Sequence, residues 1–446
     1  MSIYKDCDIR GIYGEELREA EAYEIGRAIG SMLQGKKVLL CGDARFSTDS
    51  LKEKMAEGLT ESGADIIDIG IEPTPVFYYA KSVLKTDGGV MVTASHNPWQ
   101  YNGFKVVLGD RPITTEDIRE IESIVAKKSY TVGKGSVETL SMERRYADFI
   151  RSVIKCGNKK AVVDAGGGVM GKVAPDLFRE MGYDVVELFC ELDGRFTNRD
   201  PNPAVYSHLT KLQEAVVKNH ADYGVAFDGD GDRAVFVSDT GEVITSERSL
   251  CIFMKYMMHG KGDSVVYDLK SSSIIKKTAE ELGVEPIMER SGHAFIKKTF
   301  LAHESSLAGE ISGHFFFKEL GHDDGLFAAL KMGEILSKST KKLSALAADI
   351  PMTVITPDIR IKWSYDTQDA LIAHVKELGE RYKMLLLDGV RIEFDKGWLL
   401  IRKSVTEEGI TLRIEAEAKS DMQDIVNILI ENVPELEGKN ELLIKA

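Results

Sequence analysis

Three stretches of the chain repeat one order of apolar and polar positions. Each has a short β-branched run, a polar or glycine-rich loop, a stretch with apolar residues three and four apart, a glycine, and a second apolar run. The glycines, Gly63, Gly182 and Gly283, fit the residue after a helix, where left-handed dihedral angles favour glycine. A strand, a helix and a strand of this length form a βαβ unit. The pattern therefore predicts three related α/β domains.

The C-terminal part of the chain follows a different pattern. The runs "DGVRIEFDKGWLLIRKS" and "GITLRIEAEA" alternate apolar and polar residues, which is typical of half-buried antiparallel strands. The run "SDMQDIVNILIENV" has helical periodicity, and Ser420 is placed to cap that helix. Pro351 and Pro357 mark the connector. We therefore expect a smaller α+β domain here, with domains at 1–140, 141–250, 251–350 and 351–446.

Composition narrows the possible partners. The 446 residues include 57 Lys and Arg against 71 Asp and Glu, a net charge of −14, which disfavours nonspecific binding to nucleic acid. An anionic substrate still fits if basic groups gather in one cleft. The five cysteines form no CxxC pair, which indicates a reducing compartment. Without an apolar signal region or a run of about 18 apolar residues, we expect a cytoplasmic protein with no membrane partner.

The stretch "DYGVAFDGDGDRAVFVSD" carries the strongest chemical signal. Asp228, Asp230 and Asp232 alternate with glycines between two apolar runs. Three carboxylates this close repel one another unless a cation compensates them, and oxygen ligands suit Mg²⁺, Mn²⁺ or Ca²⁺. An acidic surface hairpin is the alternative. A calcium loop of the EF-hand type is disfavoured, because Arg233 stands where that loop needs glycine and the flanks are strand-like.

The stretch "DAGGGVMG" offers a second, competing function. Gly166, Gly168 and Gly171 fit the G-x-G-x-x-G pattern after a strand, and Glu187 stands where a ribose-binding acid would lie. This pattern would indicate a dinucleotide-dependent oxidoreductase. The loops in the same position of the other two repeats, "CGDARFST" and "DLKSSS", lack the pattern. We therefore interpret it as a glycine-rich turn.

Other polar loops are ambiguous when each is taken alone. In "LAGEISGHFFF", Glu310 could accept hydrogen bonds from sugar hydroxyls, and His314 could donate to a phosphate or move a proton, but a charged turn is equally compatible. In "LLIRKSVTEEG", a guanidinium, two hydroxyls and open N–H groups could form a phosphate cradle or an ordinary hairpin loop. The lysine pair in "SGHAFIKKTF" would by default be solvated.

Taken together, the motifs resemble the α-D-phosphohexomutase superfamily and, within it, the phosphomannomutase/phosphoglucomutase group. The motifs that carry the resemblance are "TASHNP", "DGDGDR", "GEISGH" and "RKSVTEEG", with "DIRG", "YNGFK" and "DPNP" in support. Their order and spacing extend over essentially the whole chain. The resemblance implies a heart-shaped molecule in which each of four domains contributes one loop to a central cleft.

The resemblance also implies an activity and a set of ligands. The enzyme would interconvert hexose 1-phosphate and 6-phosphate, of mannose or glucose, through a phosphoserine and a hexose 1,6-bisphosphate. It would use one Mg²⁺ and act as a monomer or weak homo-oligomer. The implied residues are Ser95 as phosphoserine; Ser95, Asp228, Asp230 and Asp232 at the metal; Lys105 and His96 beside Ser95; Arg10, Arg233 and Lys297 along the cleft; Glu310, Ser312 and His314 for the sugar; and Arg402, Ser404 and Thr406 for the distal phosphate.

One departure from the family pattern bears on activity. Val405 stands where the family's cradle loop usually has Asn or Gly, and Glu408 where Pro is common. A β-branched residue resists left-handed dihedral angles and offers no side-chain donor. A non-catalytic sugar-phosphate-binding relative therefore stays open as an alternative. A phosphoglucosamine mutase also stays open, because the resemblance separates it from the mannose and glucose group at one position, the residue before Ser312. The proton acceptor also stays open among Lys105, His314 and Arg10.

Overall fold

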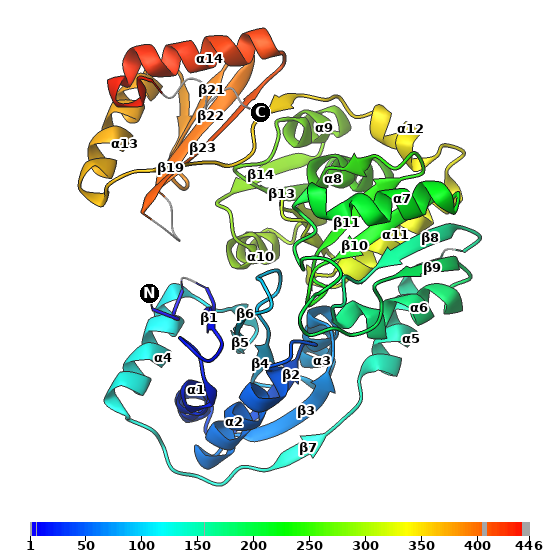
Figure 1. Ribbon diagram of the computed structural model, residues 1–446, viewed down its shortest axis with the longest axis vertical. Helices are drawn as coiled ribbons and strands as arrows, with labels where there is room; N and C mark the ends of the chain where they lie inside the picture. Colours follow the sequence, from blue (N-terminus) through cyan, green and yellow to red (C-terminus); the bar gives the residue numbers. More distant parts are fainter. Residues whose placement is uncertain (1, 6, 156, 404–407, 439–446) are drawn as a thin grey trace.

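The computed structural model describes residues 2–5, 7–155, 157–403 and 408–438. Its strands form four sheets, one in each of four successive domains. Figure 1 shows the domains along an arc, with the first and the fourth at its two ends and the second and third between them. The predicted fold class is confirmed, because three mixed α/β sheets are followed by an antiparallel sheet with helices.

The first domain contains β1 (Ile9–Ile12), α1 (Glu19–Met32), β2 (Lys37–Gly42), α2 (Thr48–Glu61), β3 (Asp65–Ile71), α3 (Thr74–Leu84), β4 (Gly88–Val92), β5 (Tyr101–Leu108), β6 (Arg111–Pro112), α4 (Thr115–Lys127) and β7 (Val137–Thr139). The strand order is β1-β5-β4-β2-β3-β7, with β6 beside β5. β2 is parallel to β3 and β4, whereas β5 is antiparallel to β4 and β1. α1, α2 and α4 share a core with one face of the sheet, and α3 packs on the other face.

The second domain contains α5 (Glu143–Val153), β8 (Lys160–Asp164), α6 (Ala174–Glu180), β9 (Asp184–Leu188), α7 (Thr210–Lys218), β10 (Tyr223–Phe227), β11 (Ala234–Ser238) and β12 (Val243–Ile244). The third contains α8 (Ser246–Met257), β13 (Ser264–Asp268), α9 (Ile274–Leu282), β14 (Glu285–Glu289), α10 (His293–Ala302), β15 (Leu307–Gly309), β16 (Phe315–Phe317), β17 (His322–Asp323), α11 (Gly325–Lys338) and α12 (Leu343–Ala348). The sheet orders are β12-β11-β10-β8-β9 and β14-β13-β15-β16-β17.

The three predicted βαβ units are present in these domains. The strand pairs β2–β3, β8–β9 and β13–β14 are each parallel, with α2, α6 and α9 between their members. The glycines after these helices have φ angles of +92°, +88° and +69°, for Gly63, Gly182 and Gly283. The left-handed conformation that each turn needs explains why glycine recurs at this position.

The fourth domain contains β18 (Val354–Ile355), β19 (Ile359–Lys362), α13 (Tyr365–Gly379), β20 (Lys383–Leu385), β21 (Val390–Phe394), β22 (Gly397–Lys403), β23 (Gly409–Ala416) and α14 (Lys419–Asn432). All its strand pairs are antiparallel, and a two-residue turn joins β21 to β22, as the "DKG" signal predicts. The capping prediction for Ser420 is wrong. Ser420 lies inside α14, whose N-cap is Ala418, because the helix begins two residues earlier than that prediction requires.

Buried apolar side chains connect the first three domains. One continuous cluster includes Met91, Phe178 and Phe315, which belong to the first, second and third domains. The fourth domain has its own core and meets the third through Leu269, Trp398 and Leu400. The first three domains therefore form one packed body. The loops that lie between these domains are held in place by it.

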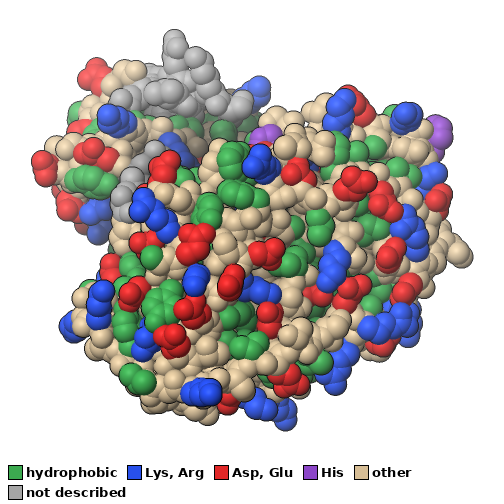
Figure 2. Space-filling model, turned by 60° about the horizontal axis from the view of Figure 1, so that its bottom comes forward, with side chains coloured by type: hydrophobic (Ala, Val, Ile, Leu, Met, Phe, Trp, Pro, Cys, Tyr) green, Lys and Arg blue, Asp and Glu red, His purple; other side chains and the backbone are tan. Residues whose placement is uncertain are grey.

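The surface carries both signs of charge. On the face in Figure 2, acidic and basic side chains are interspersed with hydrophobic ones, and neither sign forms a continuous field. Among the described helices, none has both the length and the apolar character needed to cross a bilayer.

Candidate active site

Ser95 lies in the loop between β4 and β5, and its backbone is held in an uncommon conformation. Its φ is +49°, in the left-handed region that L-residues rarely adopt. The amide of Ser95 donates to Thr93 Oγ1 at 2.9 Å, and its hydroxyl donates to Asp228 Oδ2 at 2.8 Å. His96 Nδ1 lies 3.2 Å from the same hydroxyl oxygen. Ser95 is 2% exposed, and the bond to Asp228 places its hydroxyl at the contact between the first and second domains.

Arg45 fixes this loop, although the sequence pattern does not single it out. Its guanidinium donates to the backbone carbonyls of four loop residues at 2.6–2.9 Å; these residues are Ser95, Asn97, Pro98 and Tyr101. Asp43 orients Arg45, with an Nε–Oδ2 distance of 3.2 Å, and itself accepts from Thr93 Oγ1. The only signal in the sequence is that "CGDARFST" occupies the strand-to-helix loop of the first repeat.

The three aspartates lie in the loop between β10 and β11 and are all fully buried. An oxygen from each lies within 4.8 Å of the others. Asp228 Oδ1 accepts from the backbone N–H groups of Gly231 and Arg233. The burial is incompatible with an acidic surface hairpin, and the antiparallel strands on either side are incompatible with an EF-hand.

Lys105 places a positive charge against this cluster. Its Nζ donates to Asp230 Oδ2 at 2.7 Å and also to Asp232 Oδ2. Burial opposes the charge on Lys105, but Asp230 and Asp232 together hold the pKa of its ammonium well above the usual range. Burial and the neighbouring carboxylates raise the pKa of Asp228.

The donor set fits a hard divalent cation. Asp230 Oδ1 is buried and accepts no hydrogen bond from the described residues, although Asp230 Oδ2 is paired with both Lys105 and Thr74. A buried carboxylate oxygen without a partner is costly unless a cation or water satisfies it. Closely spaced carboxylate oxygens are the ligands that Mg²⁺ prefers.

The Glu310, Ser312 and His314 loop joins β15 to β16 and is tied directly to the aspartates. His314 Nε2 lies 3.3 Å from Asp232 Oδ1, and Nδ1 lies 2.8 Å from Glu310 Oε2 and 2.8 Å from Ser312 Oγ. Burial opposes the imidazolium, but the Asp232 carboxylate and the Glu310 hydrogen bond raise the pKa of His314 to about 10. The loop therefore contributes a buried positive charge.

Two arginines complete the surroundings of Ser95. Arg10 on β1 donates to Asn97 Oδ1 at 2.7 Å and to Asp8 Oδ2 at 2.6 Å. Arg233 Nε lies 3.7 Å from Asp228 Oδ2 and 3.3 Å from His314 Nε2. Burial and these two guanidinium groups hold the pKa of His96 well below its usual range, so His96 is neutral and can donate or accept a hydrogen bond.

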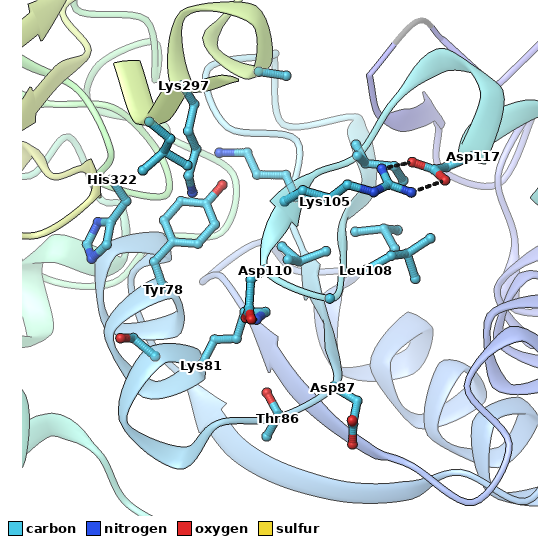
Figure 3. A pocket seen from close by; sticks show the side chains of 18 of the residues that line it. Tyr78, Lys81, Thr86, Asp87, Lys105, Leu108, Asp110, Asp117, Lys297 and His322 are labelled. Carbon is cyan, nitrogen blue, oxygen red and sulfur yellow. Dashed lines mark hydrogen bonds and ion pairs between the residues drawn. The ribbon is translucent and has the colours of Figure 1, made fainter. Parts of the chain in front are cut away.

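Other predicted residues lie further along the molecule. Lys297 on α10 rests its amine 3.9 Å from the centroid of the Tyr78 ring, beside Lys105 (Figure 3). Arg402 is the second-last residue of β22 and pairs with Asp388 in its own domain. The predictions for Ser404 and Thr406, and the departure at Val405, lie outside the described residues.

The structure adds two residues that sequence reasoning missed. Lys270, in the loop after β13, pairs with Asp358 of the fourth domain at 2.7 Å. The His293 ring at the start of α10 stacks on His314 with centroids 5.7 Å apart. Lys270 belongs to "DLKSSS", the third repeat's equivalent of the Arg45 loop, so the repeat itself was the available signal.

The glycine-rich loop is filled by protein. A Cβ on Gly166 would lie 2.4 Å from Arg199 Nη2, and one on Gly171 would lie 2.0 Å from the Cys190 carbonyl oxygen. The segment after the loop, Val169–Lys172, is a short 3₁₀ helix. These glycines permit close packing of the protein around their loop. The prediction of a glycine-rich turn is therefore confirmed, and the G-x-G-x-x-G pattern no longer indicates a dinucleotide site.

Three related α/β domains that bring a loop serine, a buried carboxylate cluster and a sugar-compatible Glu-Ser-His loop together define a phosphohexose mutase. The chain belongs to the phosphoglucomutase/phosphomannomutase family: the models of its alpha/beta/alpha domains I, II and III match residues 1–131, 144–241 and 245–354.

Comparison with individual proteins agrees with this membership. The chain is 38% identical to a phosphomannomutase/phosphoglucomutase of Pseudomonas aeruginosa over 437 residues, covering 96% of this chain and 94% of the relative. It is 36% identical to a phosphoglucomutase of Neisseria gonorrhoeae, covering 97% and 98%. The crystal structure of a phosphoglucomutase/phosphomannomutase family protein from Burkholderia thailandensis superposes with a TM-score of 0.90 at 34% identity, covering 98% of each chain.

Proposed function

We propose that the protein interconverts hexose 1-phosphate and hexose 6-phosphate, of mannose or glucose, with Ser95 carrying the phosphoryl group. The observation that supports this most directly is the 2.8 Å hydrogen bond from the Ser95 hydroxyl to Asp228 within the buried aspartate cluster. Oxygens 1 and 6 of a hexose are too far apart for a single transfer. A serine can lend its phosphate to one end of a hexose 1,6-bisphosphate and recover it from the other.

The charges around Ser95 suit this role. A phosphoserine adds about −1.5 to −2 charges, and Lys105, Arg10 and Arg233 lie around the place where that charge would develop. Asp228, Asp230 and Asp232, with a phosphoserine oxygen, would hold one Mg²⁺. A bound Mg²⁺ would supply charge neutralisation on the transferring group. Catalysis of phosphoryl transfer is largely positioning and electrostatics. The Arg45 contacts with the Ser95 loop therefore contribute by positioning Ser95.

We assign sugar recognition to Glu310, Ser312 and His314. The Glu310 carboxylate accepts from the Gly292 amide at 2.9 Å, which fixes its position for sugar hydroxyls. Neighbouring carboxylates hold His314 and Lys105 in their charged forms, so we assign both as cationic hydrogen-bond donors. The proton acceptor for the sugar hydroxyl stays open among Lys105, His314 and Arg10.

The non-reacting phosphate needs a site at the other end of the sugar. We assign it to Arg402, Ser404 and Thr406 in the fourth domain, with Lys297 along the cleft. Arg402 stands one residue before the end of β22, and its side chain is 14% exposed. Glu408, just after the cradle loop, accepts from the Tyr365 amide at 3.3 Å, which anchors that end of the loop to α13.

We also propose that the protein acts in the cytoplasm as a monomer or weak homo-oligomer. Cys41, Cys190 and Cys251 are free thiols among the described residues, which supports a reducing compartment.

A substrate panel tests the proposal. With Mg²⁺ and a trace of the matching 1,6-bisphosphate, mannose 1-phosphate or glucose 1-phosphate should yield the 6-phosphate, faster than glucosamine 1-phosphate. Tight binding of these sugars without turnover would instead identify a non-catalytic relative, and a preference for glucosamine would overturn the substrate assignment.

A further inference from the structure

A cavity of about 900 Å³ lies beside the aspartate cluster, at the junction of the first and third domains. Its walls come from α3, the β5–β6 hairpin and α10 (Figure 3). Lys105 and Lys297 lie at one end, and Thr86 and Asp87 at the other. Ser95 is not part of the lining, but Lys105, which pairs with the aspartate cluster, is, so the cavity adjoins the place where phosphate transfer is proposed.

Lys297 presents its amine at the inner end of this cavity. The amine lies over the face of the Tyr78 ring, and within the described part of the chain it has no hydrogen bond or ion pair with a carboxylate. The side chain of Lys297 is half-buried, whereas the next residue, Lys298, is exposed. A lysine that is partly desolvated and lacks a counter-ion loses part of the stabilisation of its charged form.

The charges that face Lys297 act in both directions. Burial, then Lys81 on α3 and Lys105 on β5, disfavour its ammonium, while Asp323 on β17 and Asp232 in the acidic loop favour it. The balance lowers the pKa of Lys297 to about 8. His293 and His322, on the same cavity wall, have pKa values near 3 because both are buried, so neither adds a positive charge at neutral pH.

The lining of the cavity favours anions of modest size. Lys36 and Lys85 belong to it, together with Lys81 and Arg111, which are paired with Asp110 and Asp117. Asp87 and Glu120 are the remaining acids of the lining. A phosphate group could therefore rest against the lysines of the wall while a carbon centre attached to it approaches the Lys297 amine.

We propose that Lys297 is a modification site that takes an acyl group from small acyl phosphates. The neutral Nζ attacks the carbonyl carbon and forms an N–C bond. The C–O bond to phosphate breaks, and phosphate leaves with the bonding electron pair. The nitrogen gives its surplus proton to water. The products are an Nε-acyl-lysine and inorganic phosphate, with no change of oxidation state.

Acetyl phosphate is the probe, and Lys298 is the internal control. The intact protein is treated at pH 7.5, and acetylation at each of the two lysines is followed by fragment-ion mass spectrometry. At this pH, an amine with a pKa near 8 has a far larger fraction of free base than an ordinary lysine with a pKa of about 10.4. Its lower basicity makes each free amine less reactive, which offsets part of the gain in rate. We expect Lys297 to react on the order of tenfold faster than Lys298.

Two further measurements distinguish an effect of the cavity on the acetylation rate from an effect of the lowered pKa alone. Inorganic phosphate should slow acetylation at Lys297 and leave Lys298 unchanged, because only Lys297 lies in the lysine-lined cavity. The rate at Lys297 should rise with pH and level off above about 8, since its pKa is lowered. Equal or slower reaction at Lys297 than at Lys298, or no protection by phosphate, would overturn the proposal. In Lys297→Arg the fast-reacting site should disappear while Lys298 still reacts.

Discussion

Arg45 Nη2 lies 2.8 Å from the backbone carbonyl oxygen of Ser95 and donates a hydrogen bond to it. Ser95 is a residue with a positive φ, a conformation that costs of order 1 kcal/mol or more and persists only where its surroundings impose it. The Arg45 guanidinium, itself 2% exposed, binds three further carbonyls of the same loop. Arg45 thus fixes the position of the hydroxyl that is proposed to carry phosphate.

Replacing Arg45 by lysine should lower kcat without raising KM. A single ammonium cannot reach four carbonyls in a fixed fork, so Ser95 loses its fixed position. A displacement of about 1 Å can cost on the order of 100-fold in rate. Steady-state kinetics measure the split. Arg195→Lys is the matched control, because Arg195 stacks on Phe46 and Trp99 beside the same loop. An increase in KM with normal kcat would contradict the positioning role.

Ser95→Ala should abolish both turnover and the phosphorylated form of the protein. Intact-mass spectrometry of the wild type should show a fraction about 80 Da heavier, one phosphoryl group, and this fraction should be absent from the variant. Ser312→Ala is the control, because its hydroxyl bonds to Glu310 and His314 and should affect only sugar binding. A phosphorylated fraction that persists in Ser95→Ala would assign the phosphate to another residue.

Arg402→Ala should weaken sugar-phosphate binding and leave phosphate on Ser95. The lost charged hydrogen bonds are worth about 1.5–3 kcal/mol, which corresponds to a rise in KM of roughly 10- to 150-fold. Kinetics and intact mass are measured on the same preparation. Lys403→Ala controls for the change of charge, since Lys403 pairs with Asp369 on the surface. A loss of phosphoserine equal to that in Ser95→Ala would refute separate roles for the two ends of the cleft.

Asp230→Asn should weaken metal binding by at least about tenfold, because it removes one of three anionic ligands. The Mg²⁺ dependence of turnover, after removal of metal by a chelator, measures this effect. Asp184→Asn, at an exposed residue that begins β9 of the same domain, is the control. If the two variants required the same Mg²⁺ concentration, the aspartate cluster would not be the metal site.

The sequence allowed the fold to be predicted because its signals are local. The βαβ units follow from periodicity and from glycines whose positive φ angles no other residue adopts easily. The three-aspartate motif could likewise be recognised because its members are two residues apart.

Arg45, Lys270 and His293 could not be recognised in the same way. Arg45 acts on backbone carbonyls fifty residues away, and Lys270 meets the fourth domain, so their roles depend on packing between distant segments. The contact between His293 and His314 likewise depends on how α10 packs against β15 and β16. The repeat marks the loops that carry Arg45 and Lys270, but it does not identify the residues they contact.

Asp324→Asn should stabilise the protein near neutral pH. The Asp324 carboxyl is fully buried at the start of α11, where Oδ1 accepts from the Phe327 amide at 2.8 Å and Oδ2 from the Tyr146 hydroxyl at 2.7 Å. Burial raises the pKa of Asp324 to about 7, against the two hydrogen bonds that lower it. An unfolded Asp titrates near 3.9. Between these values the folded state binds the proton more tightly, so stability falls as pH rises from about 4 to 7 and levels off above.

Asparagine stays uncharged in both states and keeps an acceptor for the Phe327 amide. The gain of Asp324→Asn over the wild type should therefore grow between pH 5 and pH 7 and reach about 1 kcal/mol or more at pH 8. Urea unfolding midpoints at pH 5, 6, 7 and 8 measure it. Asp176→Asn, with a largely exposed carboxylate on α6, should show no such trend. A difference between Asp324→Asn and the wild type that does not change with pH would mean that Asp324 is already ionised in the folded protein at pH 5.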